Sequence, residues 1–496
     1  MKNELRMLAG LLALCSAISF TACAGNNTPS SGNDTTPQVT DTQSADTTPE
    51  EPVTTRLEPN LPTDITFEGE DFNYMHWVVT HWGKNNSRDL VSEAENGETI
   101  NDAVFRRNSL ISERYGVKFS VVYEEYGNIG TVYSKLIRSD DHTYDVIFPR
   151  TVDSGSLVTE GLYYDLTQIP HLDFSQPWWD QSSVKDLSIN NRLYMVASDL
   201  TIIDKDATAA FIFNKKMAED YNLPDIYQVV SDGNWTLDTL VEYSKGVSGD
   251  INGDSVIDEN DRYGIIGQLD FSTAAFNGSG ARFAQKDSDD LPYDSFYTER
   301  NVAVCQKILE IMYNEELFFN CHLEPDVGPN EMFANNQGLF KWIRLEDVTY
   351  LREFDTDFGI IPTPKYNAEQ ENYYSTVSVH NSGLITVPSN HNNLDKVGIV
   401  LEALSAESKY ILQPAYYDVS LKTKAARDEE SSAMLDLIIG NRVFDVGDMY
   451  CFANFATSWL YLAQKGESDV TSFYEKNAKK IDKAITKLVE KVLEMD

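Results

Sequence analysis

Oxygen-bearing side chains recur at a regular spacing between residues 250 and 261. They occupy positions 1, 3, 5, 9 and 12 of a twelve-residue loop: Asp250, Asn252, Asp254, Asp258 and Asp261. Val256, at position 7, would add its backbone carbonyl. A hard cation takes about 6–8 oxygen ligands, and this spacing is typical of a loop that supplies them to Ca²⁺. We therefore predict a calcium site made by these six residues.

Two departures from the usual calcium loop leave an alternative open. Ser255 stands at position 6, where glycine usually makes the sharp turn, and Asp261 stands where a bidentate glutamate is usual. The alternative is an acidic surface turn without an ion. The loop lies between an expected helix at 235–245 and an expected strand at 262–266, so we expect any ion to brace the fold without touching a ligand.

Aromatic side chains are the second feature that suits ligand binding. A flat ring with a polar edge can stack on the apolar face of a sugar ring. Four tryptophans fall in loops or at segment ends and are our candidates for a binding cleft: Trp82, Trp178, Trp179 and Trp342. Their candidate polar and aromatic partners are Arg150, Asp199, Arg344, Tyr416 and Tyr417. Core packing is the alternative for each ring, and we expect it for Trp235 and Trp459.

Composition and motifs exclude several classes of function. Acidic residues outnumber basic ones by 78 to 40, a formal charge of −38, which argues against a nucleic acid partner. The sequence has no serine-hydrolase elbow, no His-Glu-x-x-His and no phosphate-binding loop. Because the sequence has so many carboxylates, it contains many pairs that could serve glycoside hydrolysis, and their presence does not indicate such an enzyme. We predict that the protein is not an enzyme.

The N-terminus has the pattern of an export signal. Lys2 and Arg6 precede a mostly apolar stretch at 8–20, and Phe20-Thr-Ala-Cys23 closes it. This resembles a bacterial lipobox, which implies cleavage before Cys23, lipid attachment to it and a position on the outer face of the cell membrane. An ordinary signal peptide or an uncleaved anchor is the alternative. No later stretch is long and apolar enough to span a membrane, so we expect membrane contact through the lipid anchor only.

The stretch that follows the signal is polar up to about residue 64. It is rich in Thr, Ser, Pro, Asp and Asn and cannot bury enough apolar area to fold. We predict a disordered tether of about 40 residues with a root-mean-square span of about 35 Å.

Three cysteines remain beyond the signal and the lipobox: Cys305, Cys321 and Cys451. This odd number argues against a disulfide framework. Cys305 and Cys321 could pair, but buried free thiols explain them equally well.

Strand and helix patterns alternate at the start of the folded part. Residues 72–80, 117–123 and 144–148 read as strands, and 99–115 reads as an amphipathic helix with Thr99 as its cap and Gly116 as its stop. This order predicts parallel βαβ units and an α/β fold. Ligands of such sheets bind beyond the carboxyl ends of strands, which is why Trp82, Arg150 and Asp199 are candidates.

Five segments carry a family resemblance. They are Phe211-Ile-Phe-Asn214 with the following helix, the helix start at Trp235-Thr-Leu, Gly161-Leu-Tyr-Tyr-Asp-Leu166, Gln337-Gly338 through Trp342 to Pro364, and Ser382-Gly-Leu-Ile-Thr-Val-Pro388. Together they resemble the extracellular solute-binding proteins of ABC importers, in particular the sugar-binding family related to maltodextrin-binding protein. The resemblance implies two α/β lobes joined by a hinge (a type II periplasmic-binding-protein fold) that close on a ligand.

The resemblance also sets the expected domains and partners. We expect a signal peptide at 1–22, a tether at 23–64, one lobe at 65–165 plus 320–375 and the other at 166–319 plus 376–496. It implies a monomer that binds a small solute, an oligosaccharide by preference, and delivers it to ABC permease subunits. A secreted glycan-cleaving enzyme and a surface receptor for glycan or peptide without transport are the alternatives.

The C-terminal segment predicts one further amphipathic helix. Apolar residues at 478, 481, 485, 488 and 492 form one stripe, with Lys476, Lys480, Lys483, Lys487 and Lys491 outside it. A solvated face and a contact with anionic lipid both fit these lysines.

Overall fold

The computed structural model describes residues 56–79, 88–323, 327–351, 354–423 and 428–495. All its helices and strands lie within the compact unit Leu57–Asp496. The predicted signal, Cys23, most of the tether and Trp82 lie outside the described residues. Among the described helices, none combines the length and the apolar character needed to cross a membrane.

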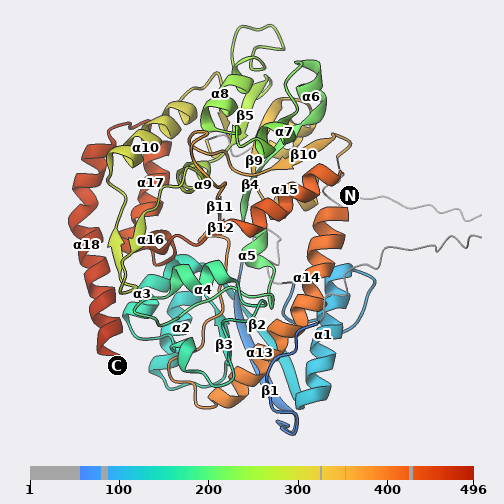
Figure 1. Cartoon of the computed structure of the whole chain (residues 1–496), viewed down its shortest axis with the longest axis vertical. Helices are drawn as coiled ribbons and strands as arrows, with labels where there is room; N and C mark the ends of the chain where they lie inside the picture. Colours follow the sequence, from blue (N-terminus) through green and yellow to red (C-terminus); the bar gives the residue numbers. More distant parts are fainter. Residues whose placement is uncertain (1–55, 80–87, 324–326, 352–353, 424–427, 496) are drawn as a thin grey trace, which may run out of the picture. The chain divides into compact units, whose positions relative to one another are not determined.

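The first sheet is parallel, as the alternating pattern predicts. β1 (Glu70–Val78) lies between β2 (Val117–Glu125) and β3 (Val146–Phe148) and pairs in parallel with both. The connections run through α1 (Thr99–Tyr115) and α2 (Ile129–Arg138). The predicted βαβ units are therefore confirmed, and Figure 1 shows these strands side by side in the first lobe.

Helix α1 shows how local sequence sets an element's limits. Its cap is Glu98, whose carboxylate accepts the Asn101 amide at 2.8 Å, and not Thr99 as predicted. Gly116 ends the helix at φ 64°, a left-handed conformation that glycine adopts without strain. The chain then enters β2 directly.

The second sheet has five strands in the order β10-β4-β9-β5-β8. Its strands are β4 (Ala209–Asn214), β5 (Tyr263–Gly267), β8 (Phe318–Asn320), β9 (Gly338–Arg344) and β10 (Phe358–Ile361). β4 is antiparallel to its two neighbours, whereas β9, β5 and β8 are mutually parallel. This sheet is the centre of the second lobe.

The predicted division between the lobes is wrong in both directions. Residues 320–375 were expected with the first lobe, but β9 and β10 pair with β4 in the second sheet. Conversely, Ile385 and Thr386 bridge Val196 and Ile147 and so extend the first sheet. The chain returns to the first lobe only after β10. The hydrophobic pattern of a strand does not indicate which of two sheets the strand joins.

Crossing segments connect the lobes. Thr208 bridges Val377, and the Val377 amide donates to the Val443 carbonyl at 3.2 Å. The short parallel pair β11 (Ser375–Thr376) and β12 (Arg442–Val443) lies at the same place. Figure 1 shows β11 and β12 between the two sheets, where a hinge is expected.

Helices cover both sheets. α13 (Leu394–Tyr410) packs on α1, while the C-terminal α18 (Val470–Glu494) contacts both α3 (Ser154–Thr159) of the first lobe and α10 (Glu299–Met312) of the second (Figure 1). The remaining helices and the short hairpin are α4 (Gln181–Leu187), α5 (Ile203–Asp206), α6 (Lys215–Asp220), α7 (Ile226–Ser231), α8 (Leu237–Lys245), α9 (Phe271–Gly278), α11 (Pro329–Ala334), α12 (Leu345–Leu351), α14 (Leu412–Pro414), α15 (Glu429–Gly440), α16 (Val446–Met449), α17 (Phe455–Gln464), β6 (Ala284–Lys286) and β7 (Pro292–Asp294).

The core contains the two tryptophans expected there. Trp235 and Trp459 are fully buried, and Trp459 packs against Phe276 and Phe296 at ring-centroid distances of 6.3 Å. Cys305, Cys321 and Cys451 are free thiols, so no disulfide joins them. Packing of apolar side chains therefore holds the body together.

Candidate ligand-binding cleft

A cavity lies at the hinge, where the crossing segments meet the second lobe. One crossing contributes Ala207 and Ala209, and another contributes Thr376, Ser378, Val379 and His380. The lining side chains from the second lobe and the C-terminal helices are Asp270, Thr273, Ala274, Trp342, Asp448 and Leu460. The cavity therefore sits where a change in the angle between the lobes would alter its width.

Two polar atoms in the cavity wall lack a partner among the described residues. The indole Nε1 of Trp342 and the hydroxyl Oγ1 of Thr273 are buried and make no hydrogen bond. A buried polar group without a partner costs about 1–3 kcal/mol of stability. A ligand with hydroxyl groups would satisfy both atoms, because a hydroxyl can accept from Trp342 and exchange a bond with Thr273.

The first lobe contributes Arg150, Asp153 and Tyr126 next to this cavity. Arg150 and Asp153 follow β3 and Tyr126 follows β2, so all lie beyond the carboxyl ends of parallel strands. The guanidinium of Arg150 makes a bidentate contact with Asp153, with Nε–Oδ2 at 2.7 Å and Nη2–Oδ1 at 2.5 Å. The Val152 amide donates to the carbonyl of cavity residue Val379 at 3.3 Å, which ties this loop to the hinge.

Two titratable groups in the cavity, His380 and Asp448, favour their neutral forms. Burial lowers the pKa of His380, partly offset by the nearby carboxylate of Asp270. Burial also raises the pKa of Asp448 well above its usual range, and the neighbouring Asp445 and Asp270 raise it further. The lowered pKa of the imidazole and the raised pKa of the carboxyl favour the uncharged forms of these two groups, which suits an uncharged ligand with many hydroxyls.

The cavity is narrow in this conformation. It leaves about 20 Å³ for the centres of water molecules, and one water needs about 10–15 Å³. A sugar ring cannot enter that space without movement. The two lobes would therefore have to separate to admit a ligand, by a motion about the crossing segments.

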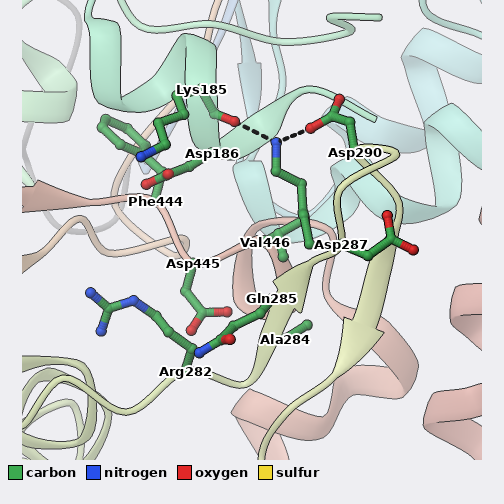
Figure 2. A pocket seen from close by; sticks show the side chains of 11 residues that line it. Lys185, Asp186, Arg282, Ala284, Gln285, Asp287, Asp290, Phe444, Asp445 and Val446 are labelled. Carbon is green, nitrogen blue, oxygen red and sulfur yellow. Dashed lines mark hydrogen bonds and ion pairs between the residues drawn. The ribbon is translucent and has the colours of Figure 1, made fainter. Parts of the chain in front are cut away.

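A larger cavity of about 390 Å³ lies elsewhere, between α4 and the hairpin of β6 and β7. Lys286 Nζ in this cavity already donates to the Lys185 carbonyl and to the carboxylate of Asp290, the latter at 2.6 Å. Figure 2 labels Lys185 and Asp290 and marks these contacts as dashed lines. The carboxylate of Asp445 accepts backbone amides, including that of Phe283 at 2.8 Å. Since these charged groups are already bound to protein atoms, we place the ligand at the narrower cavity, where polar atoms lack partners.

The fold was compared with solved structures. An ABC substrate-binding protein from Listeria monocytogenes in complex with cycloalternan superposes with a TM-score of 0.53 at 10% identity, over 86% of this chain and 99% of that one. UspC from M. tuberculosis superposes with a TM-score of 0.54 at 12% identity, over 84% of this chain and 100% of that one. An ABC transporter solute-binding protein from Thermotoga lettingae bound to α-D-tagatose superposes with a TM-score of 0.53 at 11% identity, over 85% of this chain and 100% of that one. No protein-family model and no curated protein sequence matches.

The chain has the fold of ABC-importer substrate-binding proteins. The predicted α/β fold of two lobes with a hinge is thereby confirmed. At such low identity the likeness establishes the fold, and the ligand has to be argued from the residues of this chain.

Within this substrate-binding-protein fold, one predicted residue lines the cavity and two lie on segments next to it. Trp342 lines the cavity, Arg150 lies on the loop tied to Val379, and Arg344 ends the same strand as Trp342. Arg344 is buried, forms an ion pair with Glu346 at 2.8 Å and lies within electrostatic reach of Asp270.

The structure contradicts the cleft positions predicted for Trp178 and Trp179. Both are buried, and their indole nitrogens each donate to the carboxylate of Glu402 at 3.0 Å. Glu402 lies on α13, more than two hundred residues further along the chain. Their rings are core residues of the first lobe and cannot stack on a ligand.

Asp199, Tyr416 and Tyr417 also lie away from the cavity, contrary to the prediction. Asp199 forms ion pairs with Lys205 and Lys409 at 3.6 and 3.8 Å. The Tyr416 hydroxyl donates to Asp206 at 2.8 Å, and the Tyr417 hydroxyl donates to Asp436 at 2.7 Å. Their polar groups are used for internal contacts.

Several cavity residues were missed from the sequence. Asp270 follows β5 in the chain, so the rule that sites form after strands could have found it. Thr273 lies one helical turn beyond Asp270. His380 and Asp448 lie on segments whose place at the hinge depends on the tertiary fold, and no local pattern marks them.

The predicted calcium loop folds between α8 and β5, as expected. Asp250 accepts the amides of Gly253 at 2.6 Å and Ser255 at 2.9 Å, and Asp261 accepts the amides of Ile251 and Asp258 at 2.9 and 3.1 Å. Ser255 has a φ of 69°, the conformation that glycine usually supplies at position 6. Within the described ranges, no three His, Cys, Asp or Glu side chains gather closely enough to hold a metal. Calcium binding stays a prediction.

Proposed function

We propose that this protein captures a carbohydrate in the hinge cleft and delivers it to an ABC importer. The observation that carries the proposal is the unpartnered indole Nε1 of Trp342, buried in a cavity at the hinge of a two-lobe fold. Two of the similar structures are described as bound to sugars, cycloalternan and α-D-tagatose. Binding, and not catalysis, is the role that this fold and this cavity support.

The residues divide the recognition between the two lobes. From the second lobe, Trp342 offers its ring and its indole N–H, and Thr273 offers a hydroxyl. From the first lobe, Arg150 presents a guanidinium held by Asp153 and lying 4.5 Å from the ring centroid of Tyr126. A sugar held by both sets would stabilise the closed arrangement, because each lobe alone makes only part of the contacts. We also assign Arg344 a supporting role beside Asp270.

Ligand binding would act through lobe closure. A ligand can shift an equilibrium between open and closed states only by its difference in affinity for the two. The cavity of this conformation is too narrow for a sugar ring, so the ligand-bound state would have the lobes farther apart than here but close enough for residues of both lobes to reach the sugar. The permease would then recognise the closed form.

The proposed location is the outer face of the cell membrane. Cys23 would carry the lipid, and the polar stretch that follows would hold the body, a monomer, near the permease. We further propose that Ca²⁺ binds at the 250–261 loop through Asp250, Asn252, Asp254, Val256, Asp258 and Asp261. There it would brace the connection between α8 and β5 at the external Ca²⁺ concentration.

A melting-temperature screen against mono- and oligosaccharides tests the proposed function. A solute that binds only the native state raises the melting temperature in proportion to the logarithm of its concentration above Kd. At least one glycan should do so, without being cleaved. Release of shorter products would indicate the glycan-cleaving alternative, and stabilisation by peptides alone would indicate a peptide receptor.

A further inference from the structure

We propose that one face of helix α18 docks the folded body onto an anionic lipid surface. The face consists of five exposed lysines, here called the lysine face: Lys476, Lys479, Lys480, Lys483 and Lys487. The sequence left two interpretations of the lysines on this helix open, a solvated face and a contact with anionic lipid. The lipid contact would be additional to the expected anchor and does not depend on which solute the cleft binds.

The helix geometry gathers the five lysines into one surface. At 3.6 residues per turn their directions fall within about 100°, over a length of about 17 Å along the axis. The opposite side of the helix buries Ile481, Ile485, Leu488 and Val492 against the body. The lysine face therefore points directly away from the core.

The lysine face has an acidic neighbour at its N-terminal end, where the cap residue Asp469 lies within electrostatic reach of Lys476. None of its five ammonium groups makes an ion pair or hydrogen bond with the described residues, in a chain whose acidic side chains outnumber its basic ones by 78 to 40. On the helix itself, Glu475 and Asp482 lie to one side, and Glu490 and Glu494 follow only beyond Lys487. An unpaired basic stripe on so acidic a protein indicates an anionic partner outside the chain.

The helix is held rigidly by both lobes. Near its C-terminal end the Val492 carbonyl accepts the guanidinium Nη1 of Arg192 at 3.1 Å, and towards its N-terminal end Tyr474 donates to Asp294 at 2.8 Å. The Tyr474 ring also stacks on Tyr297 at a centroid distance of 4.5 Å. The lysines are thus presented on a fixed scaffold, which lowers the entropy lost on docking.

The distance over which charges act determines whether the acidic body would prevent docking onto anionic lipid. The screening length at physiological salt is about 8 Å, so charges farther than that from the lipid act weakly. Each lysine close to an anionic surface strengthens binding by about fivefold. Several lysines at the surface therefore outweigh carboxylates held beyond the screening length.

The chain outside the described structure favours lipid over other anionic partners. Residues 24–55 would join Cys23 to the body with a root-mean-square span of about 30 Å and an extended reach of about 110 Å. Tethering at that distance keeps the lysine face at a high effective concentration next to the membrane. A second copy of this acidic chain is not tethered to the lysine face and would not have this high effective concentration.

Vesicle co-sedimentation of a fragment beginning at Leu57 tests the proposal. This fragment contains the whole compact unit and lacks the anchor, so any binding comes from the body. It should bind phosphatidylcholine vesicles that contain about one third phosphatidylglycerol, but not phosphatidylcholine alone. Binding should disappear at about 0.5 M salt, where the screening length is only a few ångströms.

A matched pair of variants assigns the binding to α18. The test variant carries Lys476→Gln, Lys480→Gln, Lys483→Gln and Lys487→Gln. The control removes the same charge from four other exposed lysines through Lys118→Gln, Lys135→Gln, Lys185→Gln and Lys245→Gln. Binding should weaken at least about 25-fold in the test variant, the effect of two fully effective lysines, and little in the control. Melting temperatures report that both variants are folded.

Three results would overturn the proposal. The first is no binding to anionic vesicles at low salt. The second is an equal loss of vesicle binding in the two variants, which would mean that the number of positive charges matters and their position on α18 does not. The third is self-association of the fragment without vesicles, abolished by the test variant, which would assign the lysine face to a second copy of the chain.

Discussion

Arg150 lies over the ring of Tyr126, with its guanidinium carbon 4.5 Å from the ring centroid, while the same guanidinium holds Asp153 in a bidentate contact. Tyr126 and Arg150 come from the segments that follow β2 and β3, the two strands that flank β1 in the first sheet. The arrangement fixes a flat cationic surface next to the hinge cavity, and the proposed ligand contacts of the first lobe depend on it.

The first prediction concerns this cationic surface. Arg150→Lys keeps the charge but loses the planar fork that contacts Asp153 twice and covers Tyr126. We expect ligand affinity to fall roughly tenfold, since a misplaced side chain would no longer meet the sugar. Calorimetric titration measures the affinity, and Arg138→Lys, on an exposed ion pair with Glu160, is the control. An unchanged Kd in Arg150→Lys would remove this residue from the site.

The second prediction concerns Glu402, which accepts the indole N–H groups of Trp178 and Trp179. Burial raises the pKa of Glu402 from 4.5 to about 7 in the folded state. Its contribution to stability is therefore fully present below about pH 4.5 and is lost as the pH rises through about 7. The loss corresponds to about 3 kcal/mol at most, at 1.36 kcal/mol per pKa unit.

Denaturant unfolding at pH 5 and pH 7.5 measures this effect. The wild type should lose about 2–3 kcal/mol more than Glu402→Gln between the two pH values, because the amide does not titrate. Glu113→Gln, on an exposed face of α1, should behave like the wild type. Parallel pH profiles of wild type and Glu402→Gln would show that this carboxyl does not titrate in that range.

The third prediction concerns Arg442 at the hinge. Its guanidinium lies between two carboxylates, with Nη1 2.6 Å from Asp204 and Nη2 bound to Asp180. Arg442→Met leaves these carboxylates without their cation, and unfolding free energy should fall by about 3–5 kcal/mol. The double change Asp204→Asn with Arg442→Met should recover part of the loss. A drop below about 1 kcal/mol in Arg442→Met would mean that the cluster does not stabilise the hinge.

The fourth prediction concerns the 250–261 loop. Calcium should raise the melting temperature by a few degrees and a chelator should reverse it, since binding at about 100 times Kd adds about 2.7 kcal/mol. Asp250→Asn should abolish the response, whereas Asp289→Asn, in another exposed acidic turn, should keep it. Equal melting curves with Ca²⁺ and with chelator would contradict calcium binding and favour the alternative interpretation, an acidic surface turn without an ion.

Sequence periodicity predicted the elements whose contacts are local. The stripe at 481, 485, 488 and 492 marks α18, and the alternation from Glu70 to Phe148 marks a parallel sheet. It could not assign β9 and β10 to a lobe, because the strands that pair with them lie far away in the chain.

The site was predicted in part for the same physical reason. Arg150 was found because it directly follows a strand, and a position after a strand can be read locally. Trp178 and Trp179 have an ordinary loop context in the sequence. Their core position becomes visible only through their hydrogen bonds to Glu402, which lies on a helix far along the chain. His380 could not be found, because its role depends on where two crossing segments meet.

Calorimetric titration of the Trp342→Phe variant tests the central claim most directly. Phenylalanine keeps an aromatic ring at the cavity but removes the indole N–H that has no protein partner. With the glycan found in the melting screen, the account predicts binding roughly three- to tenfold weaker than in the wild type, the value of one hydrogen bond. Trp459→Phe, which removes a buried unpartnered N–H from a ring that packs on Phe276 and Phe296 and does not line the cavity, should bind like the wild type. Equal affinity in Trp342→Phe and the wild type would contradict a ligand site at the hinge.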